Sequence, residues 1–351
     1  MISLRILDPS AWLRTCFRFW IGRIKRKTSF CLTLFVLLFS FCFPANAQQQ
    51  KVAKIGWLGS RSAESPGSGR ELFRRGLTEL GYIEGKNLVF EYRSVENKLE
   101  RLSAVADELL RLKVDVLVTS ATPAAITAKN ATRMIPIIFL SSGDPVALGL
   151  VDSLARPGGN MTGFTTIAPL LAGKRLELLK EMIPKLSTVA VLWDPKNEGN
   201  LLLWRESQLA ARELGLQLHS MEVSSSEKYE SAFKEAIKVR SAALVMASSP
   251  LASSSRKQIV DLAAKNHLPA VYPREDYVEG SGGLMSYGPQ RAEPYGRLAL
   301  MVDKILKGSK PADIPVEQPT KFQLVINLKT AKQIGLPIPP QVLARADKVI
   351  K

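Results

Sequence analysis

The stretch Val52-Ala53-Lys54-Ile55-Gly56-Trp57-Leu58 is apolar and ends in a polar turn, and Thr188-Val189-Ala190-Val191-Leu192-Trp193 repeats this pattern later in the chain. Such runs are typical of buried β-strands. After each run an amphipathic helical pattern ends at a Leu-Gly pair, Leu80-Gly81 or Leu214-Gly215, with glycine in the position that stops a helix. The next strands are predicted at 88–92 and 217–223.

The correspondence continues to the end of each pass. In each copy a third strand leads to a turn, at 114–119 and at 242–247. A helical stretch and a strand opened by proline follow, with the strands at 135–139 and 268–272. A glycine-bounded segment closes each copy, at 159–163 and 283–288. Strands that alternate with helices predict a parallel sheet covered by helices. The chain is therefore predicted to be an α/β protein with two Rossmann-like lobes, each built from one copy of a unit of about 115 to 125 residues.

The repeat also predicts domain boundaries. Lobe 1 is expected to hold residues 48–163 together with about 289–327, because the helix at 293–307 and the strand at 322–327 are expected to return to it. Lobe 2 is expected to hold residues 164–288. The tail, 328–351, is assigned to neither lobe. The glycine-bounded segments lie where the chain is expected to cross between lobes, so they are the predicted hinges.

Residues 1–47 have the pattern of a secretory signal peptide. Arg23, Lys25, Arg26 and Lys27 precede the apolar block Phe30–Phe43, and the small residues of Ala45-Asn46-Ala47 form a cleavage site. The block is shorter than the roughly 20 residues of a spanning helix, so cleavage after Ala47 and a periplasmic protein are predicted, with a retained anchor as the alternative.

Composition excludes several classes of function. The predicted leader contains all three cysteines, so the exported part has no disulfide or thiolate chemistry. The whole chain has 48 basic and 32 acidic residues. The leader contains seven of the basic residues and one of the acidic residues, so the exported part keeps a net charge of +10. These charges are scattered, without the basic runs or aromatic-basic alternation of nucleic-acid binding. His219 and His267 are not spaced for a metal, and no Walker loop or nucleophile elbow is present. We therefore expect no enzyme activity, no cofactor, no metal and no nucleic-acid partner.

Several motifs indicate a family. The chain carries Gly143-Asp144-Pro145-Val146, Leu154-Ala155-Arg156-Pro157-Gly158-Gly159-Asn160, Gly173-Lys174-Arg175-Leu176-Glu177-Leu178-Leu179 and Met285-Ser286-Tyr287-Gly288. With Phe73–Leu77, Leu80–Tyr82 and Thr119–Pro123 these motifs resemble the tryptophan-binding-type substrate-binding proteins of ABC importers, over about 52–350. The resemblance implies a type I periplasmic-binding-protein fold whose two lobes close on a small molecule. It favours an amino acid as the ligand.

Ligand contacts are expected in the loops after the strands, because the carboxyl ends of parallel strands form the binding edge. The candidate residues are Ser60, Ser68, Ser120, Thr122, Asp144, Trp193, Asp194, Ser249, Tyr272, Arg274 and Tyr287. Several have alternatives: Thr122 and Asp144 as helix caps, Trp193 and Tyr272 as core residues, and Arg274 in a surface ion pair. Tyr287, in a predicted hinge, would contact ligand only in the closed form.

The function predicted from these features is that of a periplasmic solute-binding protein. It is expected to act as a monomer that captures a small molecule between its lobes and delivers it to an ABC permease in the inner membrane. The alternative is a periplasmic sensor subunit with the same closing motion and a signalling partner. An exported enzyme on this scaffold is the third hypothesis.

Overall fold

The computed structural model describes residues 52–60 and 68–351, so the predicted leader and most of the loop after the first strand lie outside the described residues. Within the described part, no helix is long and apolar enough to cross a membrane.

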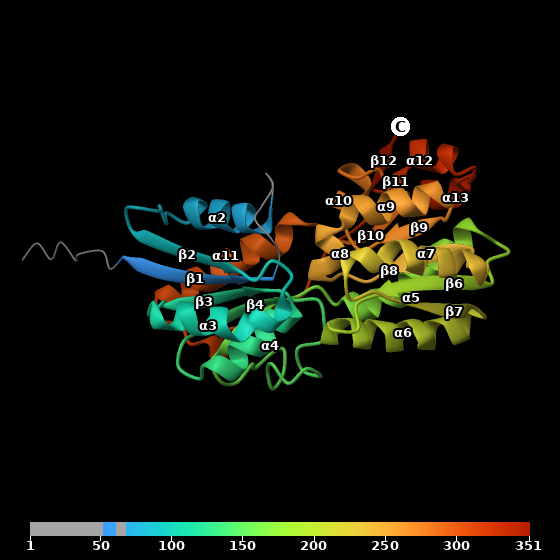
Figure 1. Cartoon of the computed structure of the whole chain (residues 1–351). Helices are drawn as coiled ribbons and strands as arrows, with labels where there is room; N and C mark the ends of the chain where they lie inside the picture. Colours follow the sequence, from blue (N-terminus) through green and yellow to red (C-terminus); the bar gives the residue numbers. More distant parts are fainter. Residues whose placement is uncertain (1–51, 61–67) are drawn as a thin grey trace, which may run out of the picture. The chain divides into compact units, whose positions relative to one another are not determined.

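The first sheet is parallel and has the strand order β2-β1-β3-β4-β5. Its strands are β1 (Ala53–Gly59), β2 (Leu88–Ser94), β3 (Val116–Ser120), β4 (Ile137–Ser141) and β5 (Met161–Thr165). Its helices are α2 (Gly69–Glu79), α3 (Leu102–Arg111), α4 (Thr122–Ala131) and α11 (Ala292–Leu306). Helices α2 and α11 pack on one face, and α3 and α4 cover the other (Figure 1). Both faces are thus buried, which explains why the strands read as continuous apolar runs.

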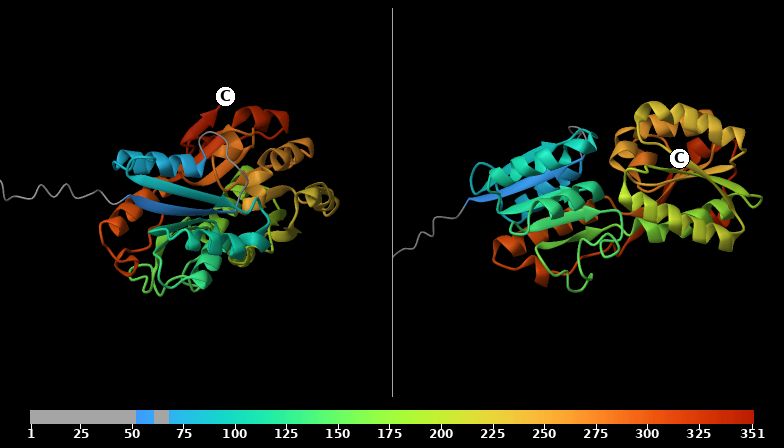
Figure 2. Two further views of the ribbon diagram at one scale, coloured as in Figure 1. Left: turned by 60° about the vertical axis from the view of Figure 1, so that its left-hand side comes forward. Right: turned by 60° about the horizontal axis from the view of Figure 1, so that its bottom comes forward.

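The second sheet has the order β12-β11-β10-β9-β8-β6-β7. Its strands are β6 (Thr188–Trp193), β7 (Gln217–Glu222), β8 (Ala243–Met246), β9 (Ala270–Tyr272), β10 (Met285–Pro289), β11 (Phe322–Asn327) and β12 (Lys348–Ile350). One face carries α5 (Leu171–Met182), α6 (Glu198–Leu214), α12 (Leu328–Gln333) and α13 (Pro340–Leu343). The other carries α7 (Tyr229–Lys238), α8 (Pro250–Ser254), α9 (Arg256–Lys265) and α10 (Asp276–Glu279). Figure 2, right, separates the yellow α7 and orange-yellow α9 from the yellow-green α6 on the opposite face.

The predicted repeat appears as the same strand order in both sheets. In the order of the chain, each pass is arranged second-first-third-fourth-fifth, as β2-β1-β3-β4-β5 and as β7-β6-β8-β9-β10. The helix stops also agree, because Gly81 and Gly215 have φ of +90° and +65°, which glycine adopts without the steric penalty of a side chain. The two-lobed α/β architecture is therefore as the sequence predicts.

The chain crosses between the two sheets three times. The prediction that the strand at 322–327 returns to the first lobe is wrong. The crossings lie between β5 and α5, between β10 and α11, and between the short helix η4 (Pro311–Asp313) and β11. Helix α11 packs beside α2 in the first lobe, but β11 pairs antiparallel with β10 in the second sheet. The tail then adds β12 parallel to β11. An apolar strand pattern does not specify its partner, and the open edge of β10 offers unpaired backbone groups that β11 satisfies.

The two glycine-bounded segments are strands rather than flexible crossings. Residues 161–165 and 285–289 form β5 and β10, paired within their sheets. A Cβ at Gly163 would lie 2.1 Å from the carbonyl oxygen of Phe139, and one at Gly288 would lie 2.1 Å from that of Pro273. These glycines are therefore required by close backbone approach, and the crossings themselves begin just after the strands.

The shortest helices complete the description. They are the 3-10 turns η1 (Leu99–Arg101), η2 (Ala168–Leu170) and η3 (Ser226–Lys228). The turn η2 follows Ile167, whose φ of +46° turns the first crossing sharply into α5.

Candidate binding site

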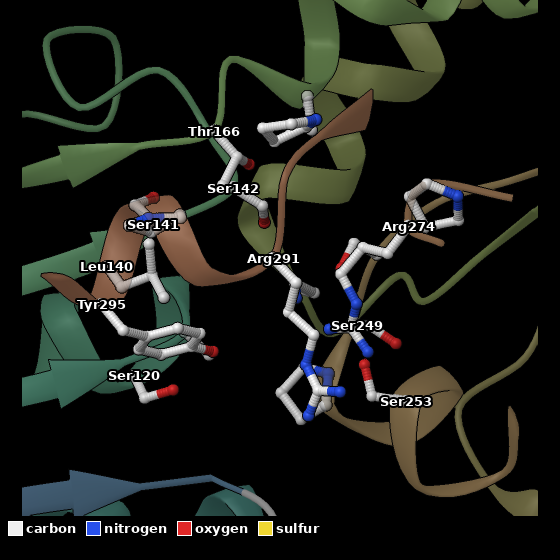
Figure 3. A pocket seen from close by; sticks show the side chains of 18 of the residues that line it. Ser120, Leu140, Ser141, Ser142, Thr166, Ser249, Ser253, Arg274, Arg291 and Tyr295 are labelled. Atoms are coloured by element: carbon white, nitrogen blue, oxygen red, sulfur yellow. The ribbon is translucent and has the colours of Figure 1, made fainter. Parts of the chain in front are cut away.

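A cavity of about 110 Å³ is lined by residues of both lobes. Figure 3 shows the side chains that line it. They lie at the ends of β3, β4 and β5 in the first lobe and of β8, β9 and β10 in the second. Further lining residues come from α5, α8 and α11, from a short turn before α5, and from the cap position before α6. The lining consists of Ser120, Ala121, Leu140, Ser141, Ser142, Thr166, Ala168, Arg175, Asn197, Ser248, Ser249, Pro250, Ser253, Pro273, Arg274, Pro289, Gln290, Arg291, Pro294 and Tyr295. The cavity thus lies at the carboxyl ends of parallel strands, where ligands bind in open α/β sheets.

The first-lobe wall is a set of hydroxyl groups held by a buried threonine. Thr122, fully buried behind the wall, lies 3.0 Å from the Oγ of Ser141 through its own Oγ1 and accepts a hydrogen bond from the Ser142 backbone N–H at 3.3 Å. Ala121 has a φ of +106°, a strained conformation for a residue with a side chain. It stands at the start of α4 without a side-chain cap, so the first N–H groups of that helix favour an anion nearby.

The second-lobe wall uses side chains that cap helices. Ser249 accepts a hydrogen bond from the Ala252 N–H at 3.0 Å, and Asn197 accepts one from the Gly199 N–H at 3.0 Å. Both side chains are buried. Each acceptor oxygen has one partner in its own helix, and this bond fixes the position of the side chain in the wall.

Arg274 reaches the cavity from an ion-pair cluster. Its Nε and Nη2 donate to the two carboxylate oxygens of Asp276 at 3.0 and 2.7 Å, and Arg256 donates to the same carboxylate at 2.7 Å. Burial alone would raise the pKa of Asp276, but these guanidinium groups hold it below its usual range. The cluster fixes the position of Arg274 and balances much of its charge.

Arg175 is the most unusual residue of the site. It lies on α5, is 1% exposed, and lines the cavity without any carboxylate partner in the described part of the chain. Its Nε donates to the carbonyl oxygen of Tyr287 at 2.9 Å, while Nη1 has no hydrogen-bond partner. Burial lowers the pKa of Arg175 to about 10, so the guanidinium still carries its charge at neutral pH. A buried, unpaired charge is costly unless a ligand completes it.

The crossing between β10 and α11 adds Arg291 and Tyr295. Arg291 extends between Tyr295 and Ser253 in Figure 3, and its backbone N–H is held by Glu275 Oε1 at 3.1 Å. Its guanidinium forms no ion pair with a described residue. Tyr295 is the only aromatic residue among the described residues of the lining. A Cβ at Gly69 would lie 2.2 Å from the Tyr295 ring, so Gly69 makes room for this side chain.

Three of the predicted site residues line the cavity: Ser120, Ser249 and Arg274. Thr122 supports the wall from behind. Ser60 is buried, and its Oγ donates a hydrogen bond to the Ser120 carbonyl oxygen at 3.4 Å. Ser68 instead caps α2 by accepting from the Glu71 N–H at 3.3 Å.

The other candidates lie away from the cavity. Asp144 is exposed and caps the Val146 and Ala147 N–H groups, which is its alternative role. Trp193 stacks on Trp204, and Tyr272 on Tyr277, both within the second-lobe core. Core packing therefore replaces the expected ring stacking on a ligand.

Asp194 and Tyr287 also have structural positions outside the lining. Burial raises the pKa of Asp194, whose Oδ1 accepts from the Lys196 N–H at 3.0 Å. The Tyr287 ring stacks on Phe322 of β11, while its backbone oxygen receives Arg175. The site depends on the Tyr287 carbonyl group rather than on its ring.

The sequence reasoning missed Arg175, although a signal was present. The helix α5 buries Leu171, Ala172, Leu176, Leu178 and Leu179, and Arg175 lies on the same face. A charged residue within an apolar helical face indicates a special role. Ser141, Ser142, Thr166, Asn197, Ser248, Ser253, Gln290, Arg291 and Tyr295 were also missed. Their polar types are common in loops and gave no comparable signal.

The described residues include no group of three or more His, Cys, Asp or Glu side chains that could hold a metal ion.

The chain matches, over residues 64–350, the family described as ABC transporter substrate binding protein. The chain belongs to this family. Proteins of the family bind small molecules outside the cytoplasm and work with ABC transporters.

Relatives of this ABC substrate-binding protein agree with the assignment. It is 27% identical over 264 residues to a tyrosine-binding protein of Clostridioides difficile, covering 75% of each chain. A domain from Streptococcus pneumoniae solved with L-Trp is 28% identical, with a TM-score of 0.78 over 85% of this chain and 99% of that one. A conserved domain protein of Vibrio cholerae is 29% identical, with a TM-score of 0.80 over 85% and 100% of the chains. The first of these relatives is named as a binding protein, and the second was solved in complex with an amino acid.

Proposed function

We propose that this protein captures a small solute bearing a carboxylate in the cavity lined by Arg175 and delivers it to an ABC permease. The observation that carries the proposal is the buried guanidinium of Arg175, which belongs to a residue of the cavity lining and whose Nη1 lacks a hydrogen-bond partner. A guanidinium in this state matches the oxygens of a carboxylate. The uncapped start of α4 supports the same ligand group.

The proposed mechanism is closure of two lobes on the ligand. Ser120 and Ser141 belong to the first lobe, while Arg175 and Arg274 belong to the second. A ligand that touches both sets stabilises the closed form over the open one by its differential contacts. The permease then recognises the closed form, and no covalent step is needed.

Amino acids are the first ligands to test, because one relative is named a tyrosine-binding protein and another was solved in complex with L-Trp. The cavity offers Leu140, Pro250, Pro294 and the ring of Tyr295 as apolar surface for a side chain. The proposed carboxylate contact is common to all amino acids and to other organic acids, so the class is defined by the acid group.

We also propose that the protein is exported with its leader cleaved after Ala47 and acts as a monomer. The leader pattern and the family's place outside the cytoplasm support this. Mass spectrometry of the exported protein tests the cleavage site, and light scattering tests the monomer. A retained leader or a stable dimer would contradict the respective statement.

A thermal-shift screen of amino acids and other carboxylic acids tests the binding function. A ligand at about 100 times its Kd should add about 2.7 kcal/mol to the free energy of unfolding. The variant Arg175→Met should lose the shift. Its control, Lys174→Met, changes the preceding residue of the same helix, which is partly exposed and pairs with Glu177; this variant should retain the shift. If no carboxylate shifts the wild-type transition, the proposal fails.

A further inference from the structure

The charges around the cavity are unbalanced. Its lining contains three arginines, Arg175, Arg274 and Arg291, and no acidic residue within the described part of the chain. Asp276 pairs with Arg274 on one side and Arg256 on the other. Arg175 and Arg291 have no ion-pair partner among the described side chains.

Glu275 forms a hydrogen bond with the Arg291 backbone, and the Arg291 charge also acts on Asp276, but neither carboxylate lines the cavity. The Glu275 Oε1 accepts the Arg291 backbone N–H at 3.1 Å, which uses the carboxylate to hold the crossing segment. Burial raises the pKa of Glu275. This carboxylate therefore positions the backbone of Arg291 and leaves its guanidinium available to a ligand.

A zwitterionic amino acid would also need a group to receive its ammonium. All side-chain acceptors among the described lining residues are neutral, and three of them already have partners: Ser141 Oγ lies 3.0 Å from Thr122 Oγ1 and accepts from the Gly143 N–H. Asn197 and Ser249 accept from backbone N–H groups of their own helices. An ammonium placed here would lose water, gain no carboxylate from the described lining residues and stand near the guanidinium groups of Arg175 and Arg291.

We propose that this site selects a net-negative organic acid without an ammonium group, in preference to the corresponding amino acid. This inference rests on the proposed function, because it concerns the ligand of the same cavity. Arg175 receives the carboxylate at the buried end, and Arg291 supplies the second positive charge from the crossing between β10 and α11. The selection follows from charge, so it applies whatever the ligand's apolar part is.

Matched pairs that differ only by the amino group test the inference. Isothermal titration of the full exported chain compares indole-3-propionate with tryptophan, 3-(4-hydroxyphenyl)propionate with tyrosine, and glutarate with glutamate. In any pair that binds, we expect the member without the amino group to have a Kd at least about tenfold lower. An amino acid that binds as tightly as its partner, or more tightly, overturns the inference and leaves the proposed function intact. Absence of binding by every compound instead refutes the carboxylate function, and the inference with it.

Two variants locate the source of the preference. Arg291→Gln should reduce the ratio of the two Kd values by about tenfold, because it removes one charge that repels an ammonium. The matched control is Arg297→Gln on α11, the helix that follows Arg291; Arg297 is exposed and paired with Glu317, and this variant should leave the ratio unchanged. An unchanged ratio in Arg291→Gln would overturn the part assigned to Arg291.

Discussion

The Nε of Arg175 donates a hydrogen bond to the carbonyl oxygen of Tyr287 across 2.9 Å. This bond joins α5, which the chain enters after its first crossing, to β10, which it leaves at the second. A Cβ at Gly288 would lie 3.7 Å from the Arg175 Nη2, so the guanidinium lies directly beside that strand. An arginine that lines the cavity is thus hydrogen-bonded to the strand that precedes the second crossing between the lobes.

Replacing Arg175 by methionine should stabilise the empty protein and weaken binding. Methionine fills similar space without a buried charge, so the free energy of unfolding should rise by about 1 to 3 kcal/mol. The Kd for a carboxylate should rise by about 100-fold, because the group opposite the ligand is lost. Chemical denaturation and calorimetric titration measure the two effects. A variant that is both less stable and still binds would contradict this account.

Removing the charge of Asp276 should destabilise the second lobe in a pH-dependent way. Asp276→Asn leaves Arg274 and Arg256 without their shared carboxylate and should cost about 3 kcal/mol at pH 7. Since the pKa of Asp276 is lowered in the folded protein, its contribution is complete above pH ~5 and is lost progressively as the pH falls through the unfolded and then the folded pKa. Denaturation curves at pH 7 and pH 3 should therefore show a smaller difference at pH 3. The control Asp261→Asn, in an exposed pair with Lys257, should change stability by less than about 0.5 kcal/mol; an equal loss at both pH values would refute the prediction.

The hydrogen bond between Asn97 and Ser254 should slow ligand release. Asn97, in the first lobe, donates through Nδ2 to the Ser254 Oγ of α8 at 3.0 Å, so it bridges the two lobes. Asn97→Gly keeps the left-handed backbone, at φ +66°, and removes the bridge. Stopped-flow measurements should show dissociation faster by about fivefold, equivalent to ~1 kcal/mol.

Glu96→Gly is the matched control for this bridge. Glu96 also has a positive φ, +52°, so glycine relieves the same kind of strain next to Asn97 without touching the bond. It should leave the dissociation rate unchanged. Ser254→Ala should reproduce the effect of Asn97→Gly, and the double variant should add nothing further. Additive effects would show that the two side chains act separately.

Gly163→Ala should destabilise the first lobe strongly. The added Cβ would lie 2.1 Å from the Phe139 carbonyl oxygen, a backbone atom of the neighbouring strand that cannot move aside alone. We expect a loss of about 2 to 4 kcal/mol in the free energy of unfolding. Gly85→Ala, at φ +80° in open space, should cost only about 1 kcal/mol of backbone strain. Comparable losses in both variants would exclude close packing as the reason for glycine at 163.

The parts of the fold that follow from local pattern were predictable. The strand Thr188–Trp193 and the helix ends at Gly81 and Gly215 lie where the sequence predicts them. Apolar periodicity and glycine conformation act over a few residues, so one sequence carries that information. The repeat predicted the two-lobed arrangement because both passes carry the same series of signals.

The binding site was predicted less well, because its residues are selected by position. Trp193 and Tyr272 end strands, as ligand-stacking residues would, yet each has another ring beside it in the core. Arg175 and Arg291 are far apart in the sequence and become neighbours of one cavity only after two crossings. Local sequence patterns cannot predict that two such distant residues line the same cavity.

The amino-acid sequence alone determined that two equivalent α/β units form this protein, because each strand and helix is specified by neighbouring side chains. Only the tertiary structure decided that β11 completes the second sheet, that Gly163 and Gly288 allow close packing, and that a buried arginine faces the cavity. These outcomes depend on the open edge of the second sheet at β10, on the backbone segments that lie next to the two glycines, and on the absence of an ion-pair partner for Arg175 among the described residues. All three are relations between distant parts of the chain, and they exist only once it has folded.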